Sequence, residues 1–128
     1  MSWYFKALKN FMKFAGRARR KEFWWFILTN AVIICVVPST LVVLMNYSII
    51  PPGIGLFIFV FYTSAAVLLT LPTISVSVRR LHDIGMSGLF LLVHFIPTIG
   101  TIIVVLLMLK KGDSGANAFG EDPLESDP

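Results

Sequence analysis

The chain has 128 residues, of which 56% are apolar and 14% are charged. A soluble domain is usually about 45–50% apolar and about 25% charged. The composition therefore excludes a disordered chain, a collagen-like repeat and a disulfide scaffold, and it argues against an ordinary water-soluble globule. The formal net charge of +4 leaves a nucleic-acid partner and a membrane surface open until the charges are located in the sequence.

The first 22 residues form a basic arm, which holds seven of the eleven lysines and arginines. On a helical wheel of residues 3–15 the lysines gather on one face, and the opposite face is aromatic and apolar. This pattern predicts an amphipathic helix that lies in the membrane plane with its cations towards anionic lipid headgroups. The cations assigned to lipid or partner contacts are Lys6, Lys9, Lys13, Arg17, Arg19 and Arg20.

Three uncharged stretches follow the arm. They are Phe23–Met45, Ile54–Val78 and Leu89–Leu109, of 23, 25 and 21 residues. About 20 apolar residues cross the hydrocarbon core of a bilayer. The sequence therefore predicts an all-α membrane protein with three transmembrane helices (23–45, 54–78 and 89–109) after the interfacial helix. The three-span membrane domain covers 23–109, between the basic arm (1–22) and a polar acidic tail (110–128).

The orientation follows from the tendency of Lys and Arg to stay on the cytoplasmic side. The connection Asn46–Gly53 has no cation, whereas the arm has seven and the connection Arg79–Gly88 has two. We therefore expect a cytoplasmic N-terminus and a first turn, broken by Pro51, Pro52 and Gly53, on the outer side.

The third stretch allows two interpretations, because Pro97 and Gly100 interrupt it near the middle. As one kinked helix it would be about 31 Å long, which matches a bilayer, and it would export the tail. As a re-entrant hairpin it would return Lys110 and Lys111 to the cytoplasm, which suits the charge rule better. Irregular backbone at that depth must be shielded by protein. Because two other spans offer little shielding, the full span is the preferred interpretation.

The second span ends in Arg79, Arg80, Leu81, His82 and Asp83. Guanidinium groups suit phosphate, and a His–Asp pair can perform acid–base chemistry. Adjacent helical residues point about 100° apart, however, and Arg79 and Asp83 are spaced for an ordinary i,i+4 ion pair. We weigh a lipid-headgroup or partner contact against structural pairing and expect no catalytic residue.

Polar side chains inside the predicted spans are few. His94, Thr98 and Thr101 share a helical face, and an ionisable group inside a membrane suggests a function. A hydrogen bond to another helix is the simpler interpretation. The remaining positions are the intramembrane polar residue Asn30 and a small-residue stripe for close helix packing, Ala66, Thr70, Thr73 and Ser77.

The sequence offers no metal-ligand cluster, phosphate-binding loop or nucleic-acid motif, so we expect no cofactor, no metal and no nucleic-acid partner. Cys35 is the single cysteine and is expected to pack among the helices. The tail Gly112–Pro128 holds five acids and several turn-forming residues. We expect it to be exposed and to fray at its end.

Three strings together resemble a known family: FAGRARRKEFW (14–24), RRLHDIGMSG (79–88) and GDSGANAFGEDP (112–123), with IPTIG (96–100) between the last two. Over nearly its full length the chain resembles domain of unknown function 805, the YhaH-like bacterial inner-membrane proteins. The resemblance implies a location and a topology rather than an activity. The chain departs from the family at three positions. Met86 stands where the family often has a cation, Leu89 where it often has Trp, and Ala118 where it usually has Arg. The loss of the tail Arg weakens the idea that a tail cation binds an anionic ligand.

The preferred interpretation is a small, non-enzymatic, multi-pass protein of the bacterial inner membrane with a cytoplasmic N-terminus. At its cytoplasmic face it would contact anionic membrane lipids, a second copy or a membrane protein partner. One alternative is a transporter or channel subunit with a polar path at His94, Thr98 and Thr101. A second is a membrane-embedded enzyme acting on lipid phosphate through Arg79, Arg80 and His82.

Overall fold

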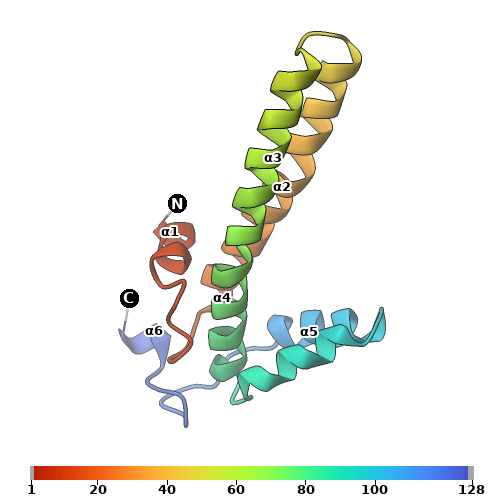
Figure 1. Cartoon of the computed structure of the whole chain (residues 1–128). Coiled ribbons are helices and arrows are strands. Elements are labelled where there is room, and N and C mark those ends of the chain that lie inside the picture. Colours follow the sequence, from red (N-terminus) through yellow and green to blue (C-terminus); the bar gives the residue numbers. More distant parts are fainter. Residues whose placement is uncertain (1, 127–128) are drawn as a thin grey trace.

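The structure is a computed structural model, which describes residues 2–126. The described residues form helices and turns, with an isolated bridge between Asn117 and Gly120 and no strand. The all-helical prediction is therefore confirmed. The elements in chain order (Figure 1) are α1 (Ser2–Lys9), α2 (Arg20–Asn46), α3 (Pro52–Leu68), α4 (Thr70–Asp83), the 3₁₀ helix η1 (Gly88–Phe95), α5 (Ile99–Leu109) and α6 (Pro123–Ser126).

Two long apolar helices pair side by side and form the most extended part of the molecule (Figure 1). One is α2, and the other is the nearly continuous helix Pro52–Asp83 formed by α3 and α4. Both are long and apolar enough to cross a membrane. Pro52 begins α3 at a position where its missing N–H costs no hydrogen bond. Near the turn the helices approach closely, since a Cβ on Gly55 would lie 2.6 Å from Sδ of Met45.

α3 and α4 are separated at Leu69. Pro72 accounts for the break, because it has no N–H to donate to the carbonyl four residues earlier. Around this point the hydroxyl groups of the predicted packing stripe bond to their own helix. Thr70 donates to the Val67 carbonyl at 2.6 Å, and Thr73 to that of Leu69 at 2.7 Å. The stripe is covered by protein only in part: Ser77 is buried, Ala66 and Thr73 are half-buried, and Thr70 is exposed.

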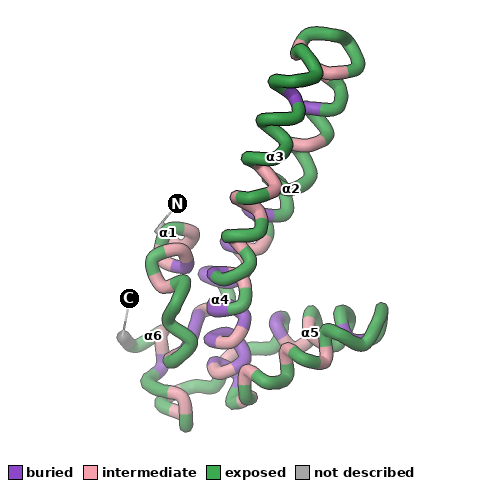
Figure 2. Tube along the Cα trace, in the orientation of Figure 1, coloured by how far each residue is buried: buried purple, intermediate pink, exposed green. Residues whose placement is uncertain are grey.

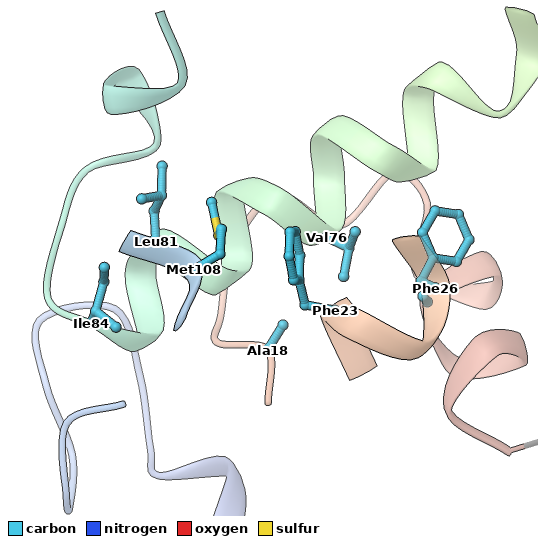
Figure 3. Close-up of a cluster of buried hydrophobic side chains, with 8 residues drawn as sticks. Ala18, Phe23, Phe26, Val76, Leu81, Ile84 and Met108 are labelled. Atoms are coloured by element: carbon cyan, nitrogen blue, oxygen red, sulfur yellow. The ribbon is translucent and has the colours of Figure 1, made fainter. Parts of the chain in front are cut away.

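Burial is concentrated at one end of the molecule. Figure 2 shows that the α2–α3 pair is mostly exposed, whereas α4 is mostly buried beyond its first turn. A small apolar core joins α1, the start of α2, α4 and the end of α5 (Figure 3). Its buried members are Ala7, Ala18, Phe23, Phe26, Val76, Leu81, Ile84 and Met108. Long apolar helices that leave their side chains exposed beside so small a core suit a lipid environment.

The arm differs from its prediction in length and in what its apolar face contacts. α1 ends at Lys9, whereas the wheel predicted a helix over residues 3–15. Its aromatic face packs on protein: the Tyr4 ring stacks on Phe26 with 5.2 Å between centroids, and Ala7 is fully buried. The expectation that this face rests on lipid is therefore corrected. The exposed apolar side chains of the arm are Phe5 of α1 and, in the loop that follows, Phe11, Met12 and Phe14.

The preferred interpretation of the third stretch, one kinked spanning helix, is wrong. η1 and α5 fold back on each other, and a Cβ on Gly100 would lie only 1.9 Å from the Val93 carbonyl oxygen. The chain reverses around Thr98, whose φ is +63°. α5 ends beside α4, where Arg80 donates to the carbonyl of Met108 at 3.3 Å. The stretch has the hairpin shape of the alternative interpretation and extends sideways from α4 (Figure 1).

Candidate functional site

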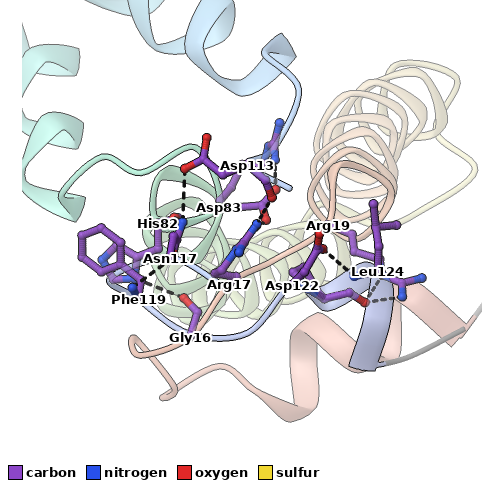
Figure 4. Close-up of polar contacts among 12 residues, drawn as sticks. Gly16, Arg17, Arg19, His82, Asp83, Asp113, Asn117, Phe119, Asp122 and Leu124 are labelled. Atoms are coloured by element: carbon purple, nitrogen blue, oxygen red, sulfur yellow. Dashed lines mark hydrogen bonds and ion pairs between the residues drawn. The ribbon is translucent and has the colours of Figure 1, made fainter. Parts of the chain in front are cut away.

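A buried ionic cluster lies at the end of α4, and Asp83 is its centre. Oδ1 of Asp83 accepts from Nε of Arg17 at 3.0 Å (Figure 4). Oδ2 of Asp83 pairs with Arg80. The side chains of all three residues are at most 6% exposed. The backbone carbonyl of Asp83 also accepts from the N–H of Asp113 at 2.8 Å. The arm, α4 and the tail therefore meet at a single residue.

The tail approaches this carboxylate closely because Gly112 has no side chain. A Cβ at this position would lie 2.2 Å from Oδ2 of Asp83. Arg17 adds two further bonds to the tail, one to the carbonyl of Asp113 and one to that of Gly115 at 2.6 Å. The guanidinium of Arg17 thus bridges the α4 carboxylate and the tail backbone.

A second buried ion pair joins the first turn of α2 to α4. Nη1 of Arg79 lies 2.7 Å from Oε1 of Glu22, and the two side chains are 5% and 2% exposed. The Arg79 carbonyl accepts from the N–H of Ala18 at 3.0 Å. Among the described residues, Nε and Nη2 of Arg79 have no hydrogen-bond partner. The buried charge of Arg79 is therefore balanced through its bond to Glu22.

His82 connects the arm and the tail. Its Nδ1 lies 3.1 Å from the carbonyl oxygen of Gly16, and because a carbonyl only accepts, Nδ1 carries the proton in this contact. The ring stacks on Phe119 with 4.1 Å between centroids (Figure 4). The backbone carbonyl of His82 accepts from Nδ2 of Asn117 at 2.9 Å. The imidazole and the neighbouring Asp83 carboxylate thus have separate structural partners, which does not resemble an acid–base pair.

Two arginines cap the end of α5. Arg80 donates to the carbonyls of Met108 and Lys110, and Arg20 donates to that of Leu109. Cations at a helix C-terminus satisfy carbonyls that have no partner inside the helix and oppose the negative end of its dipole. These contacts hold the end of the η1–α5 hairpin against α4 and the start of α2.

Asp122 organises the tail. Its Oδ1 accepts from the N–H of Leu124 at 2.8 Å at the start of α6, and Oδ2 accepts from the N–H of Gly115 at 3.0 Å. These bonds, that of Leu124 first, lower the pKa of the Asp122 carboxyl below its ordinary value. Nε of Arg19 donates to the carbonyl of Pro123 at 2.7 Å, which ties the tail to the arm a second time.

The three strings that carry the family resemblance therefore meet in space, although bonded residues are up to 104 positions apart. Residues 11–121 match the family of proteins of unknown function DUF805. The chain belongs to the DUF805 family. Two proteins of Escherichia coli strain K12 are similar to this chain. Inner membrane protein YhaI is 36% identical over 124 residues, which cover 96% of both chains. Inner membrane protein YhaH is 40% identical over 123 residues, which cover 96% of this chain and 97% of the relative. No solved structure matches. The predictions of family membership and of a membrane protein are confirmed.

In this DUF805 protein the predicted contact residues fall into two groups. Arg17, Arg79, Arg80 and Asp83 are buried, so as folded they lie out of reach of a lipid headgroup. The predicted i,i+4 pair is not formed, because Arg79 pairs with Glu22 and Asp83 with Arg80. At or near the surface remain Lys6, Lys9, Lys13, Arg19, Arg20 and the half-buried His82. Lys6 and Arg19 both lie over the ring of Trp3, each 5.3 Å from its centroid.

The polar residues predicted inside the spans do not gather in one place. His94, Thr98 and Thr101 are exposed on the η1–α5 hairpin and line no path within the described chain. Asn30 is buried in α2 and donates to the Phe26 carbonyl of its own helix at 2.8 Å. Cys35 is exposed on α2, so the expectation that it packs among the helices is corrected.

Sequence reasoning missed the tail as part of the site. The tail was expected to be exposed, but Asn117 and Phe119 contact His82, and Asp122 is buried. The predicted fraying falls on the last residues of the tail, of which 127–128 lie outside the described part. One signal was local, since Asp followed by Pro is typical of a helix start. Glu22 had a weaker signal as the single acid among the arm's cations. Among residues 2–126, His, Cys, Asp and Glu form no group of three that could hold a metal ion.

Proposed function

We propose that the chain is a multi-pass protein of the bacterial inner membrane with both termini in the cytoplasm. The observation that supports this proposal most strongly is the distribution of cations over the fold. All eleven lysines and arginines lie at the end of the molecule that holds the arm, the end of α4 and the tail, and the turn 46–53 between α2 and α3 has none. Because all eleven cations lie at this end and none lies in the turn 46–53, the tendency of Lys and Arg to stay on the cytoplasmic side strongly favours a cytoplasmic arm and tail. The relatives named as inner membrane proteins support the location.

In this proposal the η1–α5 hairpin enters the cytoplasmic leaflet without crossing the membrane. Its residues 88–109 carry no Asp, Glu, Lys or Arg, and exposed apolar side chains lie on both arms, including Leu92, Phe95, Ile102 and Leu106. The end of α5 contacts Arg80 of the ionic cluster, and Gly88 at the start of η1 lies against Val78 of α4. Arg80 and Arg20 cap the end of α5, so carbonyl groups at the point where the hairpin returns to α4 have partners.

The role we infer is non-enzymatic: a rigid cytoplasmic platform that contacts anionic lipid or a membrane partner. The cluster around Asp83, Arg79 and His82 supports a structural use of the residues considered for chemistry, since their polar groups bind the arm and the tail. Burial of Arg79 and Arg80 counts against the lipid-phosphate enzyme, and the exposure of His94 counts against a transport path. The exposed cations Lys9 and Lys13 remain to face the negative surface of the cytoplasmic leaflet.

The test compares the full chain in nanodiscs of phosphatidylglycerol and of phosphatidylcholine. We expect the anionic lipid to raise the midpoint of thermal unfolding, and Lys9→Gln with Lys13→Gln to reduce that rise. The matched control, Lys9→Arg with Lys13→Arg, keeps the charges and should keep the rise. An equal midpoint in both lipids, or an undiminished rise in the Gln variant, would contradict the proposed lipid contact.

A further inference from the structure

A long apolar groove follows the outer face of α2 at its cationic end. It has a volume of about 800 Å³ and is lined by Trp24, Trp25, Leu28, Val32, Ile33 and, from the end of α5, Leu109. Its lining begins at Arg20 and extends to Ile33, about 20 Å of helix at roughly 1.5 Å per residue. This length is similar to the depth of one leaflet, about half of a hydrocarbon core roughly 30 Å thick. The groove thus has the length and the apolar surface that suit a lipid acyl chain.

A second, smaller hollow of about 410 Å³ adjoins the groove and shares Arg20 and Lys21 with it. Its other cations are Arg19 and Lys111, and residues of the tail form most of its remaining wall. Arg20 is held at the junction by its bond to the Leu109 carbonyl. Hence the boundary between the apolar groove and the polar hollow is itself cationic.

The protein offsets only part of the positive charge of this hollow. Within residues 2–126, neither Lys21 nor Lys111 forms an ion pair. Of the three carboxylates that line the hollow, Asp83 is already paired with two arginines outside it, so the carboxylates of Asp113 and Asp122 stand against four cations, Arg19, Arg20, Lys21 and Lys111. Asp113 is exposed and accepts from Asn117. The lysine ammonium groups are therefore available to an anion from outside the chain.

We propose that this double hollow is a binding site for one anionic phospholipid. One acyl chain occupies the groove along α2, and the phosphate lies at the junction, held by Arg20, Lys21 and Lys111. The site would place the phosphate at the level where headgroups of the cytoplasmic leaflet lie, with Trp24 and Trp25 in the interfacial position that tryptophan favours. This inference rests on the proposed cytoplasmic orientation of the arm and names the lipid class and its site.

The charge pattern favours a lipid over a second copy of the chain. A copy would have to present an apolar segment that ends in an anionic group, and the acids outside the ionic cluster lie in the tail rather than beside an apolar helix. An anionic phospholipid has this arrangement in one molecule, and it surrounds α2 along the exposed length of the helix.

The experiment counts lipids on the detergent-purified full chain by native mass spectrometry, with phosphatidylglycerol and phosphatidylcholine as probes. We expect one tightly bound phosphatidylglycerol per chain. Lys21→Gln with Lys111→Gln should weaken its binding by about 10- to 30-fold, as expected for two cations close to a phosphate. The matched control, Lys21→Arg with Lys111→Arg, keeps both positive charges in the hollow and should keep the bound lipid.

A second variant tests the acyl-chain groove. Val32→Trp fills the groove and should release the bound lipid, whereas Val36→Trp, one turn further along α2 and outside the groove, should retain it. Both positions are more than half exposed, so neither substitution disturbs the core. The site would be overturned if both tryptophan variants lost the lipid or if neither did. Equal loss in the two lysine variants, or a second protein copy in place of the lipid, would overturn it too. If the nanodisc midpoint still depends on phosphatidylglycerol in those cases, the proposed function stands and only this site fails.

Discussion

The ion pair between Glu22 and Arg79 makes the sharpest energetic prediction. Glu22→Ala removes the carboxylate that lies 2.7 Å from Nη1 of Arg79, inside a region where both side chains are at most 5% exposed. Opposite charges about 4 Å apart attract by about 4 kcal/mol at an effective dielectric constant of about 20. Removing one partner of a buried pair costs about 3–5 kcal/mol because the other charge stays buried. We expect the free energy of unfolding to fall by this amount.

The loss should come from the stranded charge rather than from lost packing. Glu22→Leu combined with Arg79→Met removes both charges and should restore stability to within about 1 kcal/mol of the wild type or above it. Glu121→Ala, which removes an exposed acid, serves as the control and should change stability by no more than about 0.5 kcal/mol.

The assay is unfolding by SDS titration in mixed micelles, followed by circular dichroism. Hydrogen exchange at the Ala18 amide, which donates to the Arg79 carbonyl, reports the same region locally. A Glu22→Ala protein within about 1 kcal/mol of the wild type, the range of an exposed ion pair, would refute the reasoning. A double variant as unstable as the single one would refute it too.

Two further predictions concern the tail. Gly112→Ala places a Cβ 2.2 Å from Oδ2 of Asp83 and should lower the free energy of unfolding by about 1–3 kcal/mol in the same titration. Gly53→Ala is the control, because no atom lies within 4 Å of its Cβ, and it should leave that free energy unchanged. Equal effects of the two substitutions would contradict the close contact. The N–H of Leu124 lowers the pKa of Asp122, so the ionised carboxylate favours the docked tail. Docking should be complete above the ordinary Asp pKa of 3.8 and weaken as the pH falls below it. The Leu124 amide resonance should follow this transition in the wild type and lose it in Asp122→Ala, and a transition that persists in the variant would contradict the assignment.

The two long helices could be predicted because their signal is local. A run of apolar residues longer than a bilayer core, and a turn with two prolines and a glycine, are visible without tertiary structure. The break at Leu69 was not predicted, because the apolar run 54–78 predicted one span, although Pro72 is its local signal.

The ionic cluster could not be predicted in detail because its pairs are remote in sequence. Glu22 is 57 positions from Arg79, and Arg17 is 66 positions from Asp83. Helical periodicity offered the adjacent i,i+4 pairing of Arg79 with Asp83 instead, which the structure does not use. Only the three-dimensional fold brings the arm to α4.

The third stretch was misjudged for a related reason. Pro97 and Gly100 indicated a reversal, but the hairpin was rejected because two other spans offered little shielding. The turn at 96–99 is in fact exposed, and the hairpin is held at its base, where Arg80, which was assigned to a lipid headgroup, caps the end of α5. A charge pattern alone does not distinguish an arginine that faces lipid from one that binds a helix end.

Topology tests the central claim most directly. In a Cys35→Ala background, single cysteines are introduced as Ile49→Cys in the turn between α2 and α3 and as Ala116→Cys in the tail, both at exposed positions. A membrane-impermeant maleimide is then applied to intact spheroplasts and to lysed ones. With both termini cytoplasmic, position 49 should be labelled in intact spheroplasts and position 116 only after lysis. Labelling of position 116 in intact spheroplasts would show that the third stretch crosses the membrane and would contradict the account.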